Sequence, residues 1–158
     1  MWPCRAIHCS VTIYFEDFVP GRVFELGTVE VGAEEIIEFA ERYDPQPFHI
    51  DPVAAEDSPF GGLIASGWHT CALYMRQLFD GLIQDSSSQG SPGMEELRWL
   101  APVRPSDRLT ATYCVEEVAP SSSNPQRGTV LFRSEMVNQD GVVVLRMRGR
   151  GLYGRRPT

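Results

Sequence analysis

The segment Asp44-Pro45-Gln46-Pro47-Phe48-His49 places a carboxylate and an imidazole five positions apart. Two such groups can act as a general acid and a general base when both reach the same substrate atom. Each proline has a fixed φ and disfavours the α conformation in the residue before it, so we expect a stiff, non-helical connection. The sequence therefore predicts a rigid segment that holds an acid/base pair.

Two helices are expected to position this segment. Apolar residues at helical spacing predict a helix that opens at Gly32, runs through Tyr43 and is ended by Pro45. A longer apolar pattern predicts a central, largely buried helix from Gly67 to about Ile83, with Ser66 as its N-cap. Between them, Asp51-Pro52 predicts a short helix that reaches about Asp57.

The remaining patterns predict strands. One strand precedes the helices, and alternating residues from Met94 onward predict an antiparallel meander of four more, with Asp140-Gly141 as a hairpin turn. The expected strands are Val23–Val31, Glu95–Val103, Arg108–Ala119, Gly128–Asn138 and Val142–Tyr153. The polar stretch Gln84–Gly93 is expected to be a flexible connection. This order predicts an α+β fold with one antiparallel sheet and one buried helix.

Composition excludes several classes of function. A net charge of −7 disfavours binding to nucleic acid or to an anionic membrane, and all fourteen basic residues are arginine, which removes lysine Schiff-base chemistry. No apolar run is long enough to span a bilayer, and residues 1–13 make a poor signal peptide, so we expect a cytoplasmic location. We expect residues 1–13 to be a poorly ordered extension and residues 14–158 to form one domain.

The cysteines show no spacing typical of a metal site. Cys4, Cys9, Cys71 and Cys114 include no CxxC pair, and a tail site built from Cys4, His8 and Cys9 would lack a fourth ligand. We therefore expect reduced thiols and no bound metal.

Several segments of the chain resemble those of a known family, the MaoC-like acyl dehydratases. This family includes the (R)-specific enoyl-CoA hydratases and has the hot-dog fold. The resemblance rests on Asp44, Pro47-Phe48-His49, and Gly62-Leu63-Ile64-Ala65-Ser66-Gly67 at the start of the long helix. It extends to the turn Arg104–Asp107, where the family has Pro-Gly-Asp, and to the hairpin Asn138–Gly141. The resemblance implies a hot-dog domain with an antiparallel sheet wrapped around a long central helix.

The resemblance also implies roles for individual residues. Asp44 and His49 would form the catalytic pair, and the Gly67 backbone N–H would polarise a thioester carbonyl. Two positions depart from the family: Gln46 stands where an asparagine is usual, and Ser66 stands where a histidine is usual. Both departures affect which substrate is expected, whereas the catalytic pair Asp44 and His49 is retained.

Other residues keep two interpretations. Ser66, Trp68, Gln46 and Arg104 are candidate substrate-binding residues, although Ser66 is also a natural helix cap and Trp68 is also a natural core residue. His69 is expected to pack in the core more readily than to touch substrate. Arg146, Arg148 and Arg150 share one strand face, which is either solvated, buried between subunits or in contact with coenzyme A phosphates.

The leading hypothesis is a hydratase/dehydratase that interconverts a trans-2-enoyl-CoA and a 3-hydroxyacyl-CoA. The expected partner is the acyl-CoA substrate, with no cofactor beyond its coenzyme A, and the expected assembly is a homodimer or a higher oligomer. The alternatives are a hot-dog thioesterase and a non-catalytic acyl-thioester-binding module. A helix C-terminus beside Asp44 is expected to raise the pKa of its carboxyl group.

Overall fold

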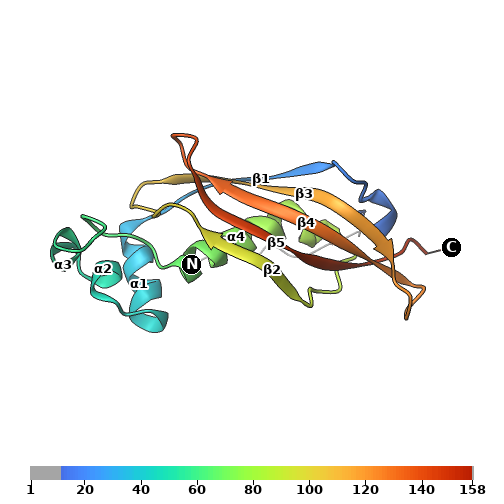
Figure 1. Cartoon of the computed structure of the whole chain (residues 1–158), viewed down its shortest axis with the longest axis horizontal. Coiled ribbons are helices and arrows are strands. Elements are labelled where there is room, and N and C mark those ends of the chain that lie inside the picture. Colours follow the sequence, from blue (N-terminus) through green and yellow to red (C-terminus); the bar gives the residue numbers. More distant parts are fainter. Residues whose placement is uncertain (1–11, 158) are drawn as a thin grey trace.

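A five-stranded antiparallel sheet curves around one long helix in the computed structural model, which describes residues 12–157. The strand order is β1-β3-β4-β5-β2, and α4 lies against the concave face of the sheet (Figure 1). The elements are η1 (Phe15–Asp17), β1 (Val23–Glu30), α1 (Ala33–Tyr43), α2 (Pro47–Ile50), α3 (Pro52–Glu56), α4 (Gly67–Gly81), η2 (Ile83–Asp85), β2 (Gly93–Trp99), β3 (Arg108–Pro120), β4 (Arg127–Val137) and β5 (Val143–Gly154). The predicted α+β hot-dog fold is confirmed.

The sheet differs from the expected meander in the position of one strand. β3, β4 and β5 form a meander, but β2 pairs with β5 at the opposite edge from β1. β2 also ends at Trp99 and not at Val103, because Val103 accepts a hydrogen bond from the Ala65 N–H, just ahead of α4. The prediction of a four-strand meander is therefore wrong for β2. The connection from β2 to β3 is instead hydrogen-bonded to the residues just before α4.

The core lies between α4 and the sheet. The strands alternate, so β3 buries Leu109, Ala111, Tyr113 and Val115 against the helix while the residues between them face outward. Across this core the Tyr74 hydroxyl lies 2.6 Å from the Ser134 hydroxyl, so two buried polar groups satisfy each other. The packing fixes the rotation of α4 about its own axis.

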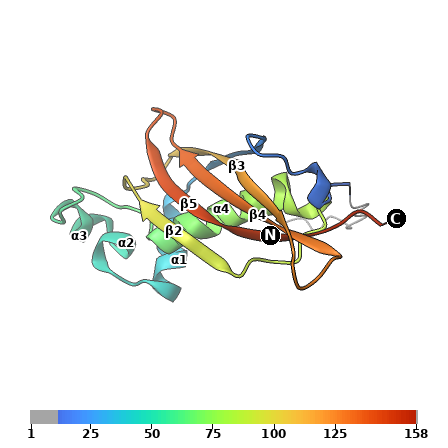
Figure 2. The same cartoon turned by 45° about the vertical axis from the view of Figure 1, so that its right-hand side comes forward.

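Helices α1 to α3 lie together beyond one end of the sheet (Figures 1 and 2). α1 ends where the Asp44 N–H donates to the Ala40 carbonyl and Pro45 prevents another turn. The expectation of a wholly non-helical segment is wrong after Gln46, because Pro47 opens the one-turn helix α2, which includes His49. Proline suits the first position of a helix, since its missing N–H would have no partner there.

The turn before β3 contains one residue with an unusual backbone. Ser106 has φ = 70°, the left-handed conformation that a type II turn requires, and the Asp107 N–H donates to the Arg104 carbonyl. The Asp107 carboxylate accepts from the Arg104 N–H at 2.8 Å and from the Gln139 amide at 2.9 Å. These bonds hold a serine in a conformation that costs a non-glycine residue about 1–2 kcal/mol.

The segment Gln84–Gly93, expected to be a flexible connection, is hydrogen-bonded to β5 over part of its length. Gln89 N–H donates to Leu152 O, Leu152 N–H donates to Gly90 O, and Gly154 N–H donates to Ser87 O, so the segment runs along β5. The predicted extension 1–13 lies outside the described residues except for Thr12 and Ile13, whose N–H groups both donate to Asp85 O.

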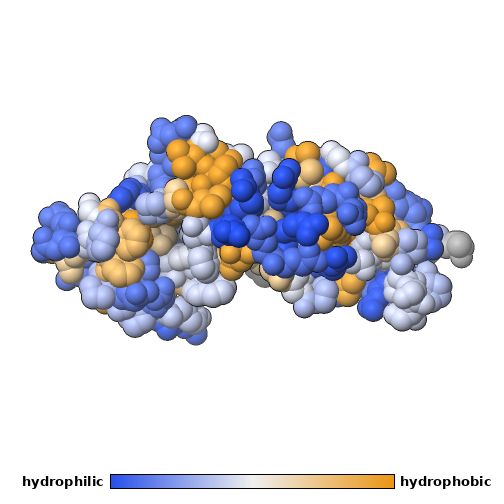
Figure 3. Space-filling model, viewed as in Figure 1, coloured by the Kyte–Doolittle hydropathy of each residue, from blue (hydrophilic) through white to orange (hydrophobic). Residues whose placement is uncertain are grey.

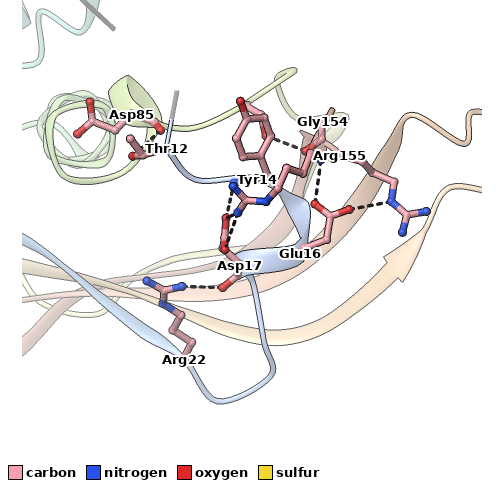
Figure 4. A network of polar contacts seen from close by, with 10 residues as sticks. Thr12, Tyr14, Glu16, Asp17, Arg22, Asp85, Gly154 and Arg155 are labelled. Carbon is pink, nitrogen blue, oxygen red and sulfur yellow. Dashed lines mark hydrogen bonds and ion pairs between the residues drawn. The ribbon is translucent and has the colours of Figure 1, made fainter. Parts of the chain in front are cut away.

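Polar contacts also tie the two ends of the domain together. Glu16 accepts from Arg155 at 2.9 Å (Figure 4). Asp17 accepts from Arg156 at 2.7 Å. These ion pairs are half-exposed, and such pairs typically contribute up to about 1 kcal/mol each.

The outer face of the sheet carries paired charges. Arg146 binds Glu135, Arg148 binds Glu95 and Glu116, and Arg150 binds Glu95. Figure 3 shows this face with hydrophilic residues over the middle of the sheet. Within residues 12–157, no helix combines the length and the apolar character needed to cross a bilayer.

Candidate active site

Asp44 lies at the C-terminal end of α1 with both carboxylate oxygens engaged. Oδ2 accepts from the Ser66 hydroxyl at 2.7 Å, and Oδ1 accepts from the Gln46 amide at 2.8 Å. Ser66 is fully buried, and its hydroxyl oxygen also accepts from the Trp68 N–H at 3.2 Å as the N-cap of α4. The predicted cap is confirmed, and it links the entrance of α4 to the carboxylate.

His49 is oriented by one backbone carbonyl. Its Nδ1 lies 2.7 Å from the Ile64 oxygen, and since a carbonyl can only accept, Nδ1 must carry the hydrogen. In the neutral ring Nε2 is then an acceptor, and it lies 3.4 Å from Asp44 Oδ2. The structure therefore brings Asp44 and His49 together, as the sequence predicted.

The pKa of the Asp44 carboxyl shifts in the direction opposite to the expectation. Burial acts to raise this pKa, but the hydrogen bonds from Ser66 and Gln46, together with the nearby His49, outweigh burial and hold it below its usual value of 3.8. The expected rise from the helix C-terminus is wrong, because donors within 3 Å act more strongly than a partial helix charge. Asp44 is therefore ionised at neutral pH.

Two acceptors that converge create a place for a small donor. The lone pair of Nε2 and the charged Oδ2 face each other, and neither can donate to the other while the ring is neutral. A water molecule can donate one hydrogen to each, which leaves an oxygen lone pair free to attack. The arrangement therefore suits activation of water.

Gly67 begins α4, where backbone N–H groups lack intrahelical partners. The Trp68 N–H is used by Ser66, whereas nothing among residues 12–157 accepts from the Gly67 N–H. A side chain at position 67 would meet the Trp99 indole, since a Cβ there would lie 2.5 Å from it. Glycine at this position thus makes room for the Trp99 indole.

A cavity of about 520 Å³ joins these groups. Asp44, His49, Gln46, Gly67 and Trp68 all line it, so the structure gathers five of the residues that the sequence singled out. Its other walls are largely apolar and come from Phe48, Phe60, Ile64, Ala65, Thr70 and the stretch 99–103. An apolar cavity with a few convergent polar groups is the usual form of a small-molecule site.

Three sequence candidates lie elsewhere. Ser66 donates a hydrogen bond to Asp44 but does not itself line the cavity. The Arg104 guanidinium donates to the Phe60 carbonyl at 2.6 Å, so it holds the segment after α3. His69 is buried on another face of α4, stacked against Phe39.

Trp99 also lines the cavity, and no sequence pattern singled it out. Its indole N–H donates to the Gly67 carbonyl at 2.8 Å, and its ring meets Trp68 edge-on at 5.3 Å. Its place depends on β2 lying at the sheet edge beside the start of α4, which no local pattern reveals. The Ile64 carbonyl was missed for a similar reason, because a backbone acceptor has no signature in sequence.

Comparison with known proteins places this geometry in a family. Residues 17–135 match the family model described as MaoC like domain. The chain belongs to the MaoC-like dehydratase family.

Individual relatives agree with this assignment. The MaoC-like dehydratase from Rhodospirillum rubrum is 41% identical, with a TM-score of 0.86 over 93% of this chain and 100% of that one. The Bacillus subtilis protein YdeM is 33% identical over 74% of this chain and 83% of its own. The R-hydratase PhaJ1 from Pseudomonas aeruginosa, at 23% identity, shares the fold with a TM-score of 0.71 over 91% of this chain and 87% of that one.

Proposed function

We propose that the protein is a hydratase/dehydratase that adds water to a trans-2-enoyl-CoA, or removes it from a 3-hydroxyacyl-CoA, at Asp44 and His49. The observation that carries the proposal is the convergence of Asp44 Oδ2 and His49 Nε2, 3.4 Å apart, in a cavity that also contains the start of α4. Membership of the MaoC-like dehydratase family supports the same class of reaction.

In this proposal the Asp44–His49 pair takes a proton from water and then delivers a proton to the substrate. Water bound between the two acceptors attacks the β-carbon while Asp44 takes a proton from it. The electron pair of the double bond moves toward the thioester oxygen, and the Asp44–His49 pair delivers a proton to the α-carbon. The pair ends in its starting protonation state, and dehydration follows the same path in reverse.

The start of α4 would stabilise the charge that develops on the thioester oxygen. The Gly67 N–H and the positive end of the helix dipole both favour negative charge at this position. Loss of one oxyanion donor typically costs about 3–4 kcal/mol of transition-state stabilisation. The apolar walls, including Phe60 and Trp99, would hold the acyl group away from water.

In the proposed reaction coenzyme A enters only as part of the substrate. We also propose a homodimer, because β2 leaves one sheet edge unpaired within residues 12–157 and apolar side chains are exposed around it. The exposed side chains include Met94, Trp99 and Leu100.

An assay with crotonyl-CoA and with longer and branched enoyl-CoAs tests the proposal. We expect loss of absorbance at the enone band without release of free thiol. Release of free thiol would identify a thioesterase instead. No reaction with the whole panel, from protein that binds these thioesters, would identify a non-catalytic binding module.

A further inference from the structure

One wall of the Asp44 cavity comes from the short segment between α3 and the entrance of α4 (Figure 1). Phe60 lies in this segment and lines the cavity. The centroid of its ring lies 5.0 Å from that of Phe48, and the Phe48 centroid lies 4.5 Å from that of His49. A row of two phenyl rings therefore leads from the imidazole of the proposed pair to Phe60.

Phe60 is 38% exposed, so part of an apolar side chain on the cavity wall still faces water. Trp99 and Leu100 are exposed lining residues too, but they lie at the sheet edge that the proposed homodimer would cover. Phe60 follows α3 and does not belong to that edge. An acyl chain that lies on the Phe60 ring would remove its exposed area from water, and burial of apolar surface favours binding.

The hydrogen bonds inside this segment give it a shape but do not attach it to the sheet. Gly61 N–H donates to the Ser58 carbonyl at 3.0 Å, and Phe60 N–H donates to Ser58 Oγ at 3.2 Å. Gly62 N–H donates to the Ala55 carbonyl at 2.9 Å. Gly61 and Gly62 have φ of 62° and 149°, which glycine adopts readily and other residues rarely. The segment is thus a tight turn built on the end of α3.

Arg104 joins this segment to the turn before β3. One terminal nitrogen of its guanidinium donates to the Phe60 carbonyl at 2.6 Å, and the other lies 3.4 Å from the place that a Cβ at Gly62 would occupy. The Arg104 backbone is itself fixed, because its N–H donates to Asp107 Oδ2 at 2.8 Å. In the part of the chain that the structure describes, Arg104 supplies the hydrogen bond between residues 58–62 and the sheet side of the domain. The position of Phe60 therefore depends on Arg104.

We propose that Phe60 determines a preference of the site for acyl chains longer than four carbons, and that Arg104 is the residue that positions it. This inference rests on the proposed acyl-CoA substrate. Because Phe60 is reached from His49 through Phe48, it would contact the outer carbons of the chain and not the reacting ones. Each fully buried methylene strengthens binding by about fourfold. Two further methylenes on the Phe60 ring would therefore strengthen binding by about tenfold.

Calorimetric titration of the intact protein with butyryl-CoA and hexanoyl-CoA tests this proposal. Both thioesters are saturated and cannot be hydrated, so the measurement does not depend on turnover. We expect the wild type to bind hexanoyl-CoA about tenfold more tightly than butyryl-CoA. Phe60→Ala should reduce this ratio to about twofold, whereas Phe60→Leu, which keeps an apolar side chain, should retain about fivefold or more. A ratio that is unchanged or higher in Phe60→Ala overturns the proposal.

A double variant tests the role of Arg104. Arg104→Gln should reduce the ratio of the two affinities to about fourfold, because the Phe60 carbonyl loses its donor. Since Arg104 acts through Phe60, the double variant with Phe60→Ala should have the same ratio as Phe60→Ala alone. Two independent structural losses would instead multiply. An unchanged ratio in Arg104→Gln, or a loss in the double variant equal to the product of the single losses, refutes the positioning role.

Arg108→Gln and Val53→Ala are the matched controls. Arg108 lies in the same turn as Arg104, but its backbone N–H donates to Gln139 Oε1 at 2.9 Å and its side chain makes no hydrogen bond to residues 58–62. Val53 is an exposed apolar residue of α3 that does not line the Asp44 cavity. Both variants should keep the wild-type ratio. A comparable fall in either control would show a general loosening of the domain and refute the proposal.

The outcome of these titrations is separate from that of the enoyl-CoA assay. If the expected ratios are found but no enoyl-CoA is hydrated, the inference about Phe60 stands and the proposed reaction fails. If crotonyl-CoA is hydrated but the ratio does not respond to Phe60→Ala, the reaction stands and the inference fails. Equal binding of the two thioesters by the wild type, or no saturable binding of either, also overturns the inference.

Discussion

Residues 12–157 contain two carboxylate–imidazole pairs of nearly equal spacing, Asp44–His49 at 3.4 Å and Glu35–His69 at 3.5 Å. In the first pair every polar atom has a neighbour that fixes it: Ser66 and Gln46 hold the carboxylate, and the Ile64 carbonyl holds the ring. In the second pair the Glu35 side chain is 44% exposed and His69 Nδ1 has no partner within residues 12–157.

The difference shows that spacing alone does not define a catalytic pair. Fixing Nδ1–H of His49 leaves Nε2 as an acceptor toward Asp44, so the pair can hold water between two acceptors. At His69 the hydrogen lies on the side of Glu35, and the free acceptor is buried behind it. The first arrangement suits proton transfer, whereas the second leaves a buried ring nitrogen without a donor among residues 12–157.

The largest expected difference between the two pairs appears in the hydration rate when the charge of each carboxylate is removed in turn. Asp44→Asn keeps the shape of the side chain but removes the base, and we expect the hydration rate to fall by about 10³-fold or more. Glu35→Gln should change that rate by less than about twofold. The measurement is kcat/KM for crotonyl-CoA, and comparable losses in both variants would erase the distinction between the pairs.

The next largest difference, in kcat, is expected when each of the two imidazoles is replaced. His49→Asn can still donate to the Ile64 carbonyl but has no group in the place of Nε2, so we expect kcat to fall about 10²–10⁴-fold with the fold retained. His69→Asn is the matched control and should keep kcat. Urea unfolding of both proteins checks that any loss is chemical. Full activity in His49→Asn would remove His49 from the mechanism.

A smaller effect is expected from Ser66→Ala. This variant loses both the donor to Asp44 and the N-cap of α4, so we expect about 1 kcal/mol less stability. Because the Ser66 hydrogen bond lowers the pKa of Asp44, its loss should move the acid limb of the kcat/KM profile to higher pH.

Ser58→Ala provides the control for this position. Ser58 also makes local side-chain hydrogen bonds, with the Ala55 carbonyl and the Phe60 N–H, but it does not contact Asp44. It should lose stability without moving the pH profile. An acid limb that stays in place in Ser66→Ala would show that Ser66 acts only as a cap.

The smallest effect concerns stability against pH. The folded pKa of Asp44 is below its usual 3.8, so the unfolded chain takes up a proton first as pH falls. The stability that Asp44 contributes is therefore present above that value and is lost as pH falls through the folded pKa. The difference in unfolding free energy between wild type and Asp44→Asn should shrink from pH 6 to pH 3. A constant difference would contradict the lowered pKa.

Much of the fold could be predicted because its signals are local. Pro45 marked the end of α1, Ser66 marked the start of α4, and Asp140-Gly141 marked the last hairpin. The place of β2 could not be predicted, since alternation identifies a strand but not the neighbour it pairs with. For the same reason the position of Trp99 beside Gly67 could not be predicted from sequence.

The site was predictable to the extent that its residues lie in one segment. The spacing of Asp44 and His49 suggested their meeting, but the direction of the pKa shift depended on Ser66, which is 22 positions away in the chain. The helix α2 was missed because two nearby prolines suggested an extended backbone, whereas Pro47 begins a turn.

The indole of Trp99 ties the geometry of the α4 entrance to the free edge of the sheet, because the same residue closes β2 and covers Gly67. In the proposed homodimer this edge would be covered by a second copy, so subunit separation would loosen the proposed oxyanion donor, the Gly67 N–H. Specific activity would then decline on dilution in step with dissociation, even though Asp44 and His49 both belong to one subunit.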